Sequence, residues 1–132
     1  MIGLDTNVVI RYLVQDDPQQ SALATQFIET VLSPVDPGFV TLVTLCEIGW
    51  VLSECYETDK RTLRAVIEGL LTSKQIVIQE AELVWKALRA LDAMAADFSD
   101  ALIGQVALAA GCRTVVTFDK GAAKLAGFEL LR

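Results

Sequence analysis

Short apolar runs alternate with longer segments of helical periodicity along this chain of 132 residues. The short runs are rich in β-branched residues and lie next to a glycine or a turn, which is typical of strands buried on both faces of a sheet. They predict strands over residues 1–4, 38–41, 75–78, 113–117 and 128–131. The longer segments predict helices over residues 6–13, 18–32, 42–55, 60–73, 81–95 and 99–110.

The alternation of strands and helices predicts the α/β class, with helices packed around a mainly parallel sheet. The sequence shows no internal repeat, low-complexity tract or linker, and its length suits a single domain over residues 1–132. In parallel sheets, functional sites form beyond the carboxyl ends of the strands. Polar residues that directly follow a predicted strand are therefore the first candidates for a site.

Composition supports a well-packed core. Hydrophobic residues make up 53% of the chain and charged residues 21%, which is ample for a globular domain. Polar side chains interrupt the apolar segments before they reach the roughly 18 residues of a membrane span, and the amino terminus lacks the pattern of a secretory signal. We therefore expect a cytoplasmic protein with no membrane partner.

The three cysteines form no C-x-x-C pair, which favours reduced, buried thiols over disulfides or a zinc site.

The chain contains no histidine and carries a net charge of −6. Without imidazole as a base, proton shuttle or metal ligand, any hydrolytic chemistry depends on carboxylates and a hard divalent cation that they hold. The negative charge argues against a nucleic-acid partner, because phosphate contacts need lysine or arginine. Cations bound by clustered acids would invert the local field and allow a polyanion to approach.

Two aspartates follow predicted strands directly. Asp5 ends the first strand at the head of a helix, and Asp119 comes just after the strand over residues 113–117. A helix cap explains Asp5 and an Asp-Lys-Gly turn explains Asp119, and both are common uses of aspartate. Their shared placement at one edge of the predicted sheet favours a site, because capping alone gives no reason for both to gather there.

Glu47 lies in a predicted helix that is apolar nearly all round, the mark of a buried helix. A carboxylate in its middle would be desolvated, at a cost of several kcal/mol unless it is neutralised, paired or bound to a cation. A salt bridge to an arginine elsewhere in the chain is the alternative to a metal site.

Asp97 and Asp100 open the most hydrophobic predicted helix. Asp97 or Ser99 can cap its amino end, and acids in a first turn suit the helix dipole. The two aspartates are three residues apart, so in one helix they would face the same way and repel. A cation would relieve that repulsion, with Asp100 as a direct ligand and Asp97 as an outer or second one.

These four acidic positions, in this order and context, resemble those of the PIN-domain ribonucleases, and within them the VapC toxins of bacterial and archaeal toxin–antitoxin pairs. The resemblance covers the whole chain and is carried by Met1-Ile2-Gly3-Leu4-Asp5-Thr6-Asn7, by Glu47 in its apolar helix, by Asp97-Phe98-Ser99-Asp100-Ala101-Leu102-Ile103 and by Thr117-Phe118-Asp119-Lys120. The architecture it implies is a PIN-like three-layer sandwich, in which helices flank a five-stranded, mainly parallel sheet. Such proteins are often homodimers.

The resemblance also implies a site and its partners. Asp5, Glu47, Asp100 and Asp119 would form the catalytic pocket, and Asp97 would join the ligands of one or two magnesium or manganese ions. The substrate would be single-stranded or loop RNA, cut to leave a 5′-phosphate. A peptide of a cognate antitoxin would cover the site. Core packing is the simpler use of most of the residues that could form an apolar groove for it, which are Phe27, Ile28, Leu52, Leu70 and Leu71.

Carboxylate-held magnesium or manganese can activate a water for attack on phosphorus, so no protein base is obligatory. Thr6, Ser99 and Thr117 are placed to hydrogen-bond the carboxylates or a phosphate, although caps and strands use such residues too. Two other functions stay open. One is a receiver-like phosphoacceptor module, which would need an acid pair after the first strand where only Asp5 stands. The other is a PIN-like protein that binds RNA without cutting it.

Overall fold

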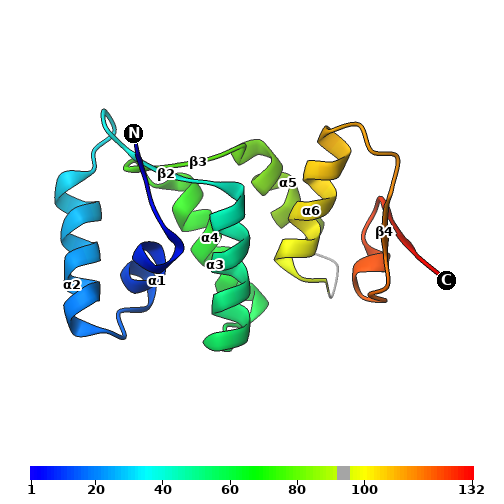
Figure 1. Cartoon of the computed structure of the whole chain (residues 1–132), viewed down its shortest axis with the longest axis horizontal. Helices are drawn as coiled ribbons and strands as arrows, with labels where there is room; N and C mark the ends of the chain where they lie inside the picture. Colours follow the sequence, from blue (N-terminus) through cyan, green and yellow to red (C-terminus); the bar gives the residue numbers. More distant parts are fainter. Residues whose placement is uncertain (92–95) are drawn as a thin grey trace. The chain divides into compact units, whose positions relative to one another are not determined.

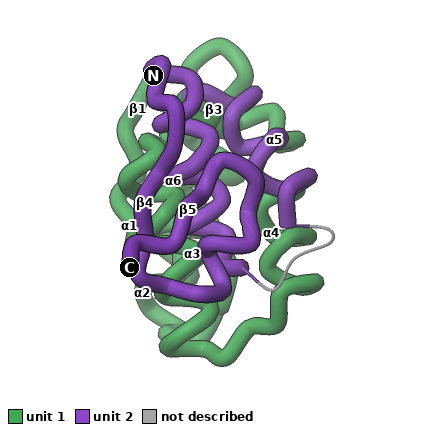
Figure 2. Tube along the Cα trace, turned by 90° about the vertical axis from the view of Figure 1, so that its right-hand side faces the viewer, with its two compact units in different colours: residues 1–79 green, residues 80–132 purple. Residues whose placement is uncertain are grey.

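The computed structural model describes residues 1–91 and 96–132, and its chain divides into two compact units, Met1–Gln79 and Glu80–Arg132 (Figure 2). The predicted alternation of strands and helices is confirmed in both (Figure 1). Unit 1 contains β1 (Ile2–Gly3), α1 (Thr6–Val14), α2 (Pro18–Gln26), η1 (Phe27–Val31), β2 (Gly38–Val40), α3 (Leu42–Cys55), α4 (Lys60–Thr72) and β3 (Ile76–Ile78). Unit 2 contains α5 (Ala81–Leu91), α6 (Phe98–Ala109), β4 (Val115–Thr117), η2 (Ala122–Lys124) and β5 (Phe128–Leu130).

The described strands pair in parallel, as predicted, but they form two sheets and not one of five strands. In unit 1, β2 lies between β1 and β3, with Gly38 paired to both Ile2 and Ile76. In unit 2, β4 pairs with β5 in the register Val115 to Phe128. The prediction of a single five-stranded sheet is therefore wrong, since the described strands form one sheet of three and one of two. Because each strand is only two or three residues long, it offers few backbone pairs, and such short strands specify their partners weakly.

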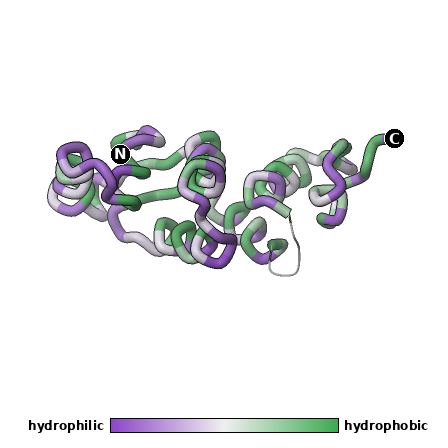
Figure 3. Tube along the Cα trace, turned by 90° about the horizontal axis from the view of Figure 1, so that it is seen from below, coloured by the Kyte–Doolittle hydropathy of each residue, from purple (hydrophilic) through white to green (hydrophobic). Residues whose placement is uncertain are grey.

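Unit 1 packs its helices and strands around one apolar core. Its strands β2 and β3 place alternate side chains inward, and its helices α1 and α4 each present an apolar stripe, so hydrophobic and hydrophilic residues alternate along them (Figure 3). The most deeply buried side chains of this core are Val9, Val40, Leu45, Ile48 and Ile67. This core holds α1, which Asp5 precedes, and α3, which carries Glu47.

Helix starts in unit 1 follow the capping signals of the sequence. Asp17, Thr41 and Asp59 precede α2, α3 and α4, and each side chain accepts a hydrogen bond from a backbone N–H of the first turn. Proline at the first position of α2 fits the same scheme. The helix predicted over residues 18–32 changes character at Phe27, because η1 is a π-helical turn whose last hydrogen bond runs from Leu32 N to Phe27 O over 3.0 Å.

Unit 2 is built from a helix pair and a two-stranded ladder. Val84 and Leu88 of α5 and Phe98 and Leu102 of α6 are buried between these helices. Gly104 of α6 meets the Phe128 ring of β5 so closely that an added Cβ would lie 2.5 Å from the ring edge. Helix α5 ends at Leu91 within the described residues, and the remainder of the helix predicted over residues 81–95 lies outside them.

Two expectations about burial are wrong. The strands are not buried on both faces throughout, because Val77 in β3 and Val116 in β4 are exposed. Nor are the thiols buried: Cys55 and Cys112 are exposed and Cys46 is half-buried, although none of the three, all within the described ranges, forms a disulfide. Among the described residues, none of the helices combines the length and the apolar character that crossing a bilayer requires.

Candidate functional site

Asp5 stands between β1 and α1 as the N-cap of the helix. Its backbone is extended, with φ −75° and ψ 157°, and its Oδ1 accepts a hydrogen bond from the Thr6 N–H at 2.9 Å. The side chain is otherwise exposed. The capping role that competed with a metal role is therefore present, although a carboxylate has acceptor sites beyond the one used here.

Glu47 is exposed on α3, so the expectation that this carboxylate is desolvated is wrong. The helix is apolar nearly all round, but it buries only one face, through Leu45, Ile48 and Leu52. Glu47 lies on the other face and forms no salt bridge within the described residues. Its Oε1 instead accepts a hydrogen bond from the buried Thr6 hydroxyl at 3.0 Å. Thr6 thus links the first turn of α1, directly after Asp5, to the Glu47 carboxylate.

Asp97 and Asp100 open α6, and their electrostatics follow the sequence analysis closely. Asp97 occupies the N-cap position with extended backbone, yet its side chain makes no capping hydrogen bond. Asp100 is half-buried in the first turn. Burial raises the pKa of the Asp100 carboxyl above its usual value, and the negative charges of Asp97 and Asp119 raise it further. The predicted repulsion between Asp97 and Asp100 is confirmed, and Asp119 adds to it.

Asp119 sits in a tight turn between β4 and η2. Its Oδ1 accepts hydrogen bonds from Gly121 N at 2.7 Å and Ala122 N at 3.2 Å, and its own N–H donates to Thr117 Oγ1 at 3.0 Å. The turn role of Asp119 is therefore present, as is the capping role of Asp5. Thr117 is a positioning residue of this turn, whereas Ser99 is half-buried in the first turn of α6.

Each unit therefore brings together part of the predicted set. In unit 1, Thr6 connects the position of Asp5 to Glu47, and in unit 2 the charges of Asp97 and Asp119 act on Asp100. Among the described residues, no three acids or cysteines are close enough to hold a metal ion as they stand. The donor chemistry still suits one, because carboxylate oxygens are the ligands that magnesium and manganese prefer and a cation would relieve the charge around Asp100.

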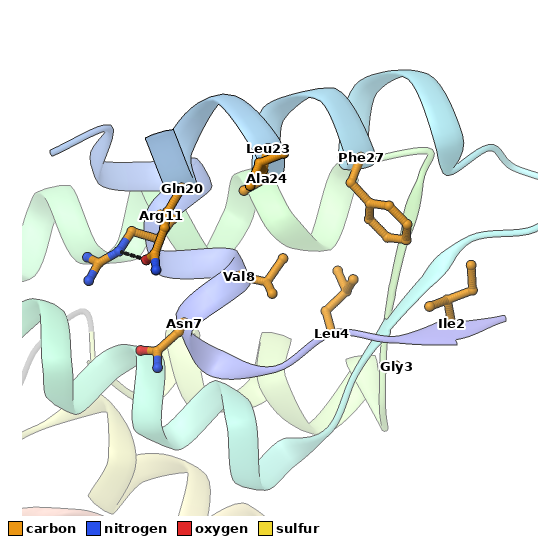
Figure 4. A pocket seen from close by; sticks show the side chains of 10 residues that line it. All are labelled: Ile2, Gly3, Leu4, Asn7, Val8, Arg11, Gln20, Leu23, Ala24 and Phe27. Carbon is orange, nitrogen blue, oxygen red and sulfur yellow. Dashed lines mark hydrogen bonds between the residues drawn. The ribbon is translucent and has the colours of Figure 1, made fainter. Parts of the chain in front are cut away.

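An apolar groove of about 590 Å³ lies in unit 1 between β1, α1 and α2 (Figure 4). Of the predicted groove residues, Phe27 does line it, whereas Ile28, Leu52 and Leu70 are buried in the core. The other lining residues are mostly apolar or small: Ile2, Gly3, Leu4, Asn7, Val8, Arg11, Gln20, Leu23 and Ala24.

Arg11, which the sequence analysis did not single out, is the cation of this groove. It donates to Gln20 Oε1 at 2.8 Å and to Asp16 Oδ1 at 3.2 Å. A hydrogen bond with the Tyr56 hydroxyl raises the pKa of Arg11, and the same hydroxyl lowers the pKa of Asp16. The sequence does contain a signal for Arg11, because the Asp16-Asp17 pair follows it by five residues at the end of an apolar helix.

The chain has similarities to known proteins. Among solved structures, the chain is similar to the crystal structure of Mycobacterium tuberculosis VapC20, described as a Sarcin-Ricin loop cleaving toxin, at 19% sequence identity and a TM-score of 0.45, over 96% of this chain and 98% of that chain. No curated protein sequence matches. The family model of the PIN domain matches residues 2–128, and the chain therefore belongs to the PIN-domain family.

Proposed function

We propose that this protein is a metal-dependent endoribonuclease that acts as the toxin of a toxin–antitoxin pair. Its membership in the PIN-domain family supports the nuclease assignment. The observation that carries the proposal is Asp100, a half-buried carboxylate whose pKa is raised by burial and by two neighbouring aspartates. No lysine or arginine pairs with it among the described residues. Such a cluster is costly without a cation and is typical of functional sites.

The proposal assigns Asp5, Glu47, Asp100 and Asp119 to one catalytic pocket, with Asp97 as a further ligand. These carboxylates would hold one or two magnesium or manganese ions. When bound, the cation supplies an activated water for attack on phosphorus and neutralises charge on the phosphoryl oxygens. The single-domain organisation over residues 1–132 is part of the same proposal.

The chain's own residues orient these carboxylates. The Thr6 hydroxyl donates a 3.0 Å hydrogen bond to Glu47 and would orient its carboxylate. Thr117 holds the turn that carries Asp119, and that turn leaves Asp119 exposed. Ser99 would hydrogen-bond a carboxylate or a phosphate from the first turn of α6. Because the chain has no histidine, protons leave through water and carboxylates and not through imidazole.

The partners in this proposal are RNA and a cognate antitoxin, with the toxin as a cytoplasmic homodimer. The groove of Figure 4 is our candidate for the antitoxin peptide, because its apolar lining and the Arg11 guanidinium suit an amphipathic segment that carries an acid.

The test is cleavage of single-stranded RNA by the purified protein with magnesium or manganese. We expect Asp5→Ala and Asp100→Asn each to abolish most of the activity, and chelation by EDTA to do the same. Asp59→Asn is the matched control, because Asp59 caps α4 and is no part of the pocket. Activity that persists in EDTA or in both pocket variants would overturn the proposal.

The same assay separates the alternatives. Tight, metal-dependent RNA binding without any product would favour the PIN-like protein that only binds RNA. The match to the PIN-domain family leaves the receiver-like module without support. A lack of mass increase after incubation with a small phosphodonor would exclude that alternative.

A further inference from the structure

The turn of unit 2 that carries Asp119 also carries two lysines. Lys120 directly follows Asp119, and Lys124 ends η2. Both lysines are exposed, and neither forms a salt bridge with an acid of the described residues. The Asp119 Oδ1 atom instead accepts the N–H groups of Gly121 and Ala122. Two cations without a counter-charge therefore stand directly beside an acid of the proposed pocket.

The backbone places the two lysines on the same side of this turn. The Ala123 N–H donates to Asp119 O over 3.0 Å, which is the hydrogen bond of one helical turn. Residues four apart on such a turn are neighbours. Lys120 and Lys124 therefore lie side by side.

Ala122 and Leu125 anchor the same turn in unit 2. Their side chains are buried, with 2% and 4% of their surface exposed, and the Leu125 N–H donates to Ala122 O over 2.9 Å. Because these residues face inward while Lys120 and Lys124 face solvent, the ammonium groups extend outward from a backbone that the core holds in place.

Two neighbouring lysines without a counter-charge repel each other. A lysine at the end of a helical turn suits the helix dipole, which explains Lys124 but not Lys120. An anion bound by both ammonium groups would relieve the repulsion, in the same way that a cation would relieve the repulsion between Asp97 and Asp100.

The neighbouring acids indicate which anion suits the lysine pair. The charge of Asp119 acts on Asp100, so the lysines and the acids of unit 2 share one region of the molecule. An RNA backbone carries one negative charge per nucleotide, so one phosphate can lie at cation-loaded acids while the next ones lie at the lysines. Lysine binds phosphate as a point charge and without sequence preference.

We propose that Lys120 and Lys124 bind backbone phosphates of a single-stranded RNA substrate, beside the phosphate that is cut. The inference rests on the proposed function and names a substrate contact of the same site. Both lysines would contact phosphates that flank the reacting one and would not touch the reacting phosphorus. The occupant of the lysine pair is therefore an RNA backbone and not an acidic protein segment.

The first experiment measures how salt changes the affinity for a single-stranded RNA with phosphorothioate linkages, which resist cleavage and keep the charge. Each phosphate that a lysine neutralises adds about 0.7 to the slope of log Kd against log salt concentration. We expect Lys120→Gln and Lys124→Gln each to lower this slope by about 0.7 and to weaken binding by about 2-fold to about 5-fold at low salt. Lys120→Arg should keep both values, because the charge remains.

Lys86→Gln is the matched control, because it removes the same charge from an exposed lysine of unit 2. Lys86 belongs to α5, and α6 lies between α5 and β4 (Figure 1). An equal fall in slope in this control would show an effect of net charge and overturn the inference. So would lysine-dependent binding of polyglutamate that is tighter than binding of RNA with the same number of charges, since it would assign the pair to an acidic protein segment.

Acetylation of the lysines by an amine-reactive ester reports directly on the contact. We expect saturating single-stranded RNA to remove most of the acetylation of Lys120 and Lys124 and to leave that of Lys86 unchanged. Mass spectrometry of the digested protein measures each site. Acetylation of Lys120 and Lys124 that RNA does not slow would overturn the inference.

Cleavage kinetics separate this inference from the proposed function. With a cleavable RNA, we expect the double variant Lys120→Gln/Lys124→Gln to raise KM by about 10-fold and to change kcat little. A loss in kcat alone would place the lysines at the reacting phosphate and overturn their flanking position. Cleavage that depends on Asp100 but has an unchanged KM in the double variant would overturn phosphate binding and leave the nuclease intact. Lysine-dependent RNA binding without any cleavage would keep phosphate binding and remove the nuclease.

Discussion

The acids at the helix starts of the two units differ in what their carboxylates do. In unit 1, Asp5, Asp17 and Asp59 each accept a backbone N–H at the start of a helix. In unit 2, Asp97 occupies the same cap position without such a bond, and its charge raises the pKa of Asp100. A carboxylate that accepts a backbone N–H at a helix start has a structural role there. An acid that caps nothing and repels its neighbour costs stability, and a bound cation gives it a reason to be there.

The largest expected effect contrasts Asp100 with Asp59. We expect Asp100→Asn to lower metal-dependent RNA cleavage by at least about 100-fold, because metal-held charge contributes several kcal/mol to the transition state. The same change should leave the metal-free protein as stable as before or more stable, since it removes a repelled charge. Asp59→Ala should do the reverse: it should lower the stability of the metal-free protein, because α4 loses its cap, and leave cleavage unchanged.

Cleavage rates together with denaturant unfolding of the metal-free proteins check this contrast. A loss of stability in Asp100→Asn that matches the loss in Asp59→Ala would mean that both acids are structural, and the difference between the units would disappear.

A second contrast concerns glycines in the helices of the two units. Gly104 of α6 faces the Phe128 ring, whereas Gly69 of α4 has no atom within 4 Å of an added Cβ. We expect Gly104→Ala to destabilise the protein by about 1–3 kcal/mol through overpacking. Gly69→Ala should stabilise it by up to about 1 kcal/mol, because alanine is the better helix former. Denaturant midpoints measure both, and an equal gain from the two changes would show that Phe128 moves aside freely.

Local signals in the sequence were sufficient for the elements but not for the sheet. The predicted helix over residues 42–55 matches α3, and each predicted strand is found in shortened form. Strand pairing depends on contacts between distant residues, and a strand such as Ile2–Gly3 carries too few side chains to specify them. Likewise, periodicity could not show that Glu47 is exposed, because the outer face of α3 also carries the apolar residues Val43 and Trp50.

The acid pair of α6 was predictable from spacing alone, because residues three apart in one helix face the same way. The hydrogen bond from Thr6 to Glu47 was predicted as a residue role but not as a contact, since it joins residues 41 positions apart. Ser99, Thr6 and Thr117 look alike in the sequence. Only the tertiary structure distinguishes Thr6, which reaches another helix, from Thr117, which serves its own turn.

Two threonines sharpen the comparison of the units at a smaller scale. Thr6→Val removes a buried donor to a carboxylate and should cost about 1 kcal/mol. It should also lower cleavage by up to about 10-fold, because Glu47 loses its orientation. Thr117→Val removes an exposed hydrogen bond within one turn and should cost less. Thermal unfolding and cleavage rates measure both, and an unchanged rate in Thr6→Val would show that the orientation of Glu47 does not matter.

The smallest expected effect is a difference in how pH acts on the two kinds of acid. The pKa of Asp100 is raised above its usual 3.8, so the unfolded chain releases this proton first and stability falls as pH rises from about 3.8 through the folded pKa. The backbone hydrogen bond from Thr62 lowers the pKa of Asp59. The stability that the Asp59 carboxylate contributes is therefore present above about pH 3.8 and is lost as the pH falls through the folded pKa.

Relative to the metal-free wild type, Asp100→Asn should therefore have a higher melting temperature between about pH 4 and about pH 7, and Asp59→Asn a lower one. We expect shifts of about 1–3 °C, because water screens both carboxylates. Excess magnesium should remove the gain in Asp100→Asn by stabilising the wild type, and a gain that magnesium leaves unchanged would show that Asp100 does not take part in binding the cation.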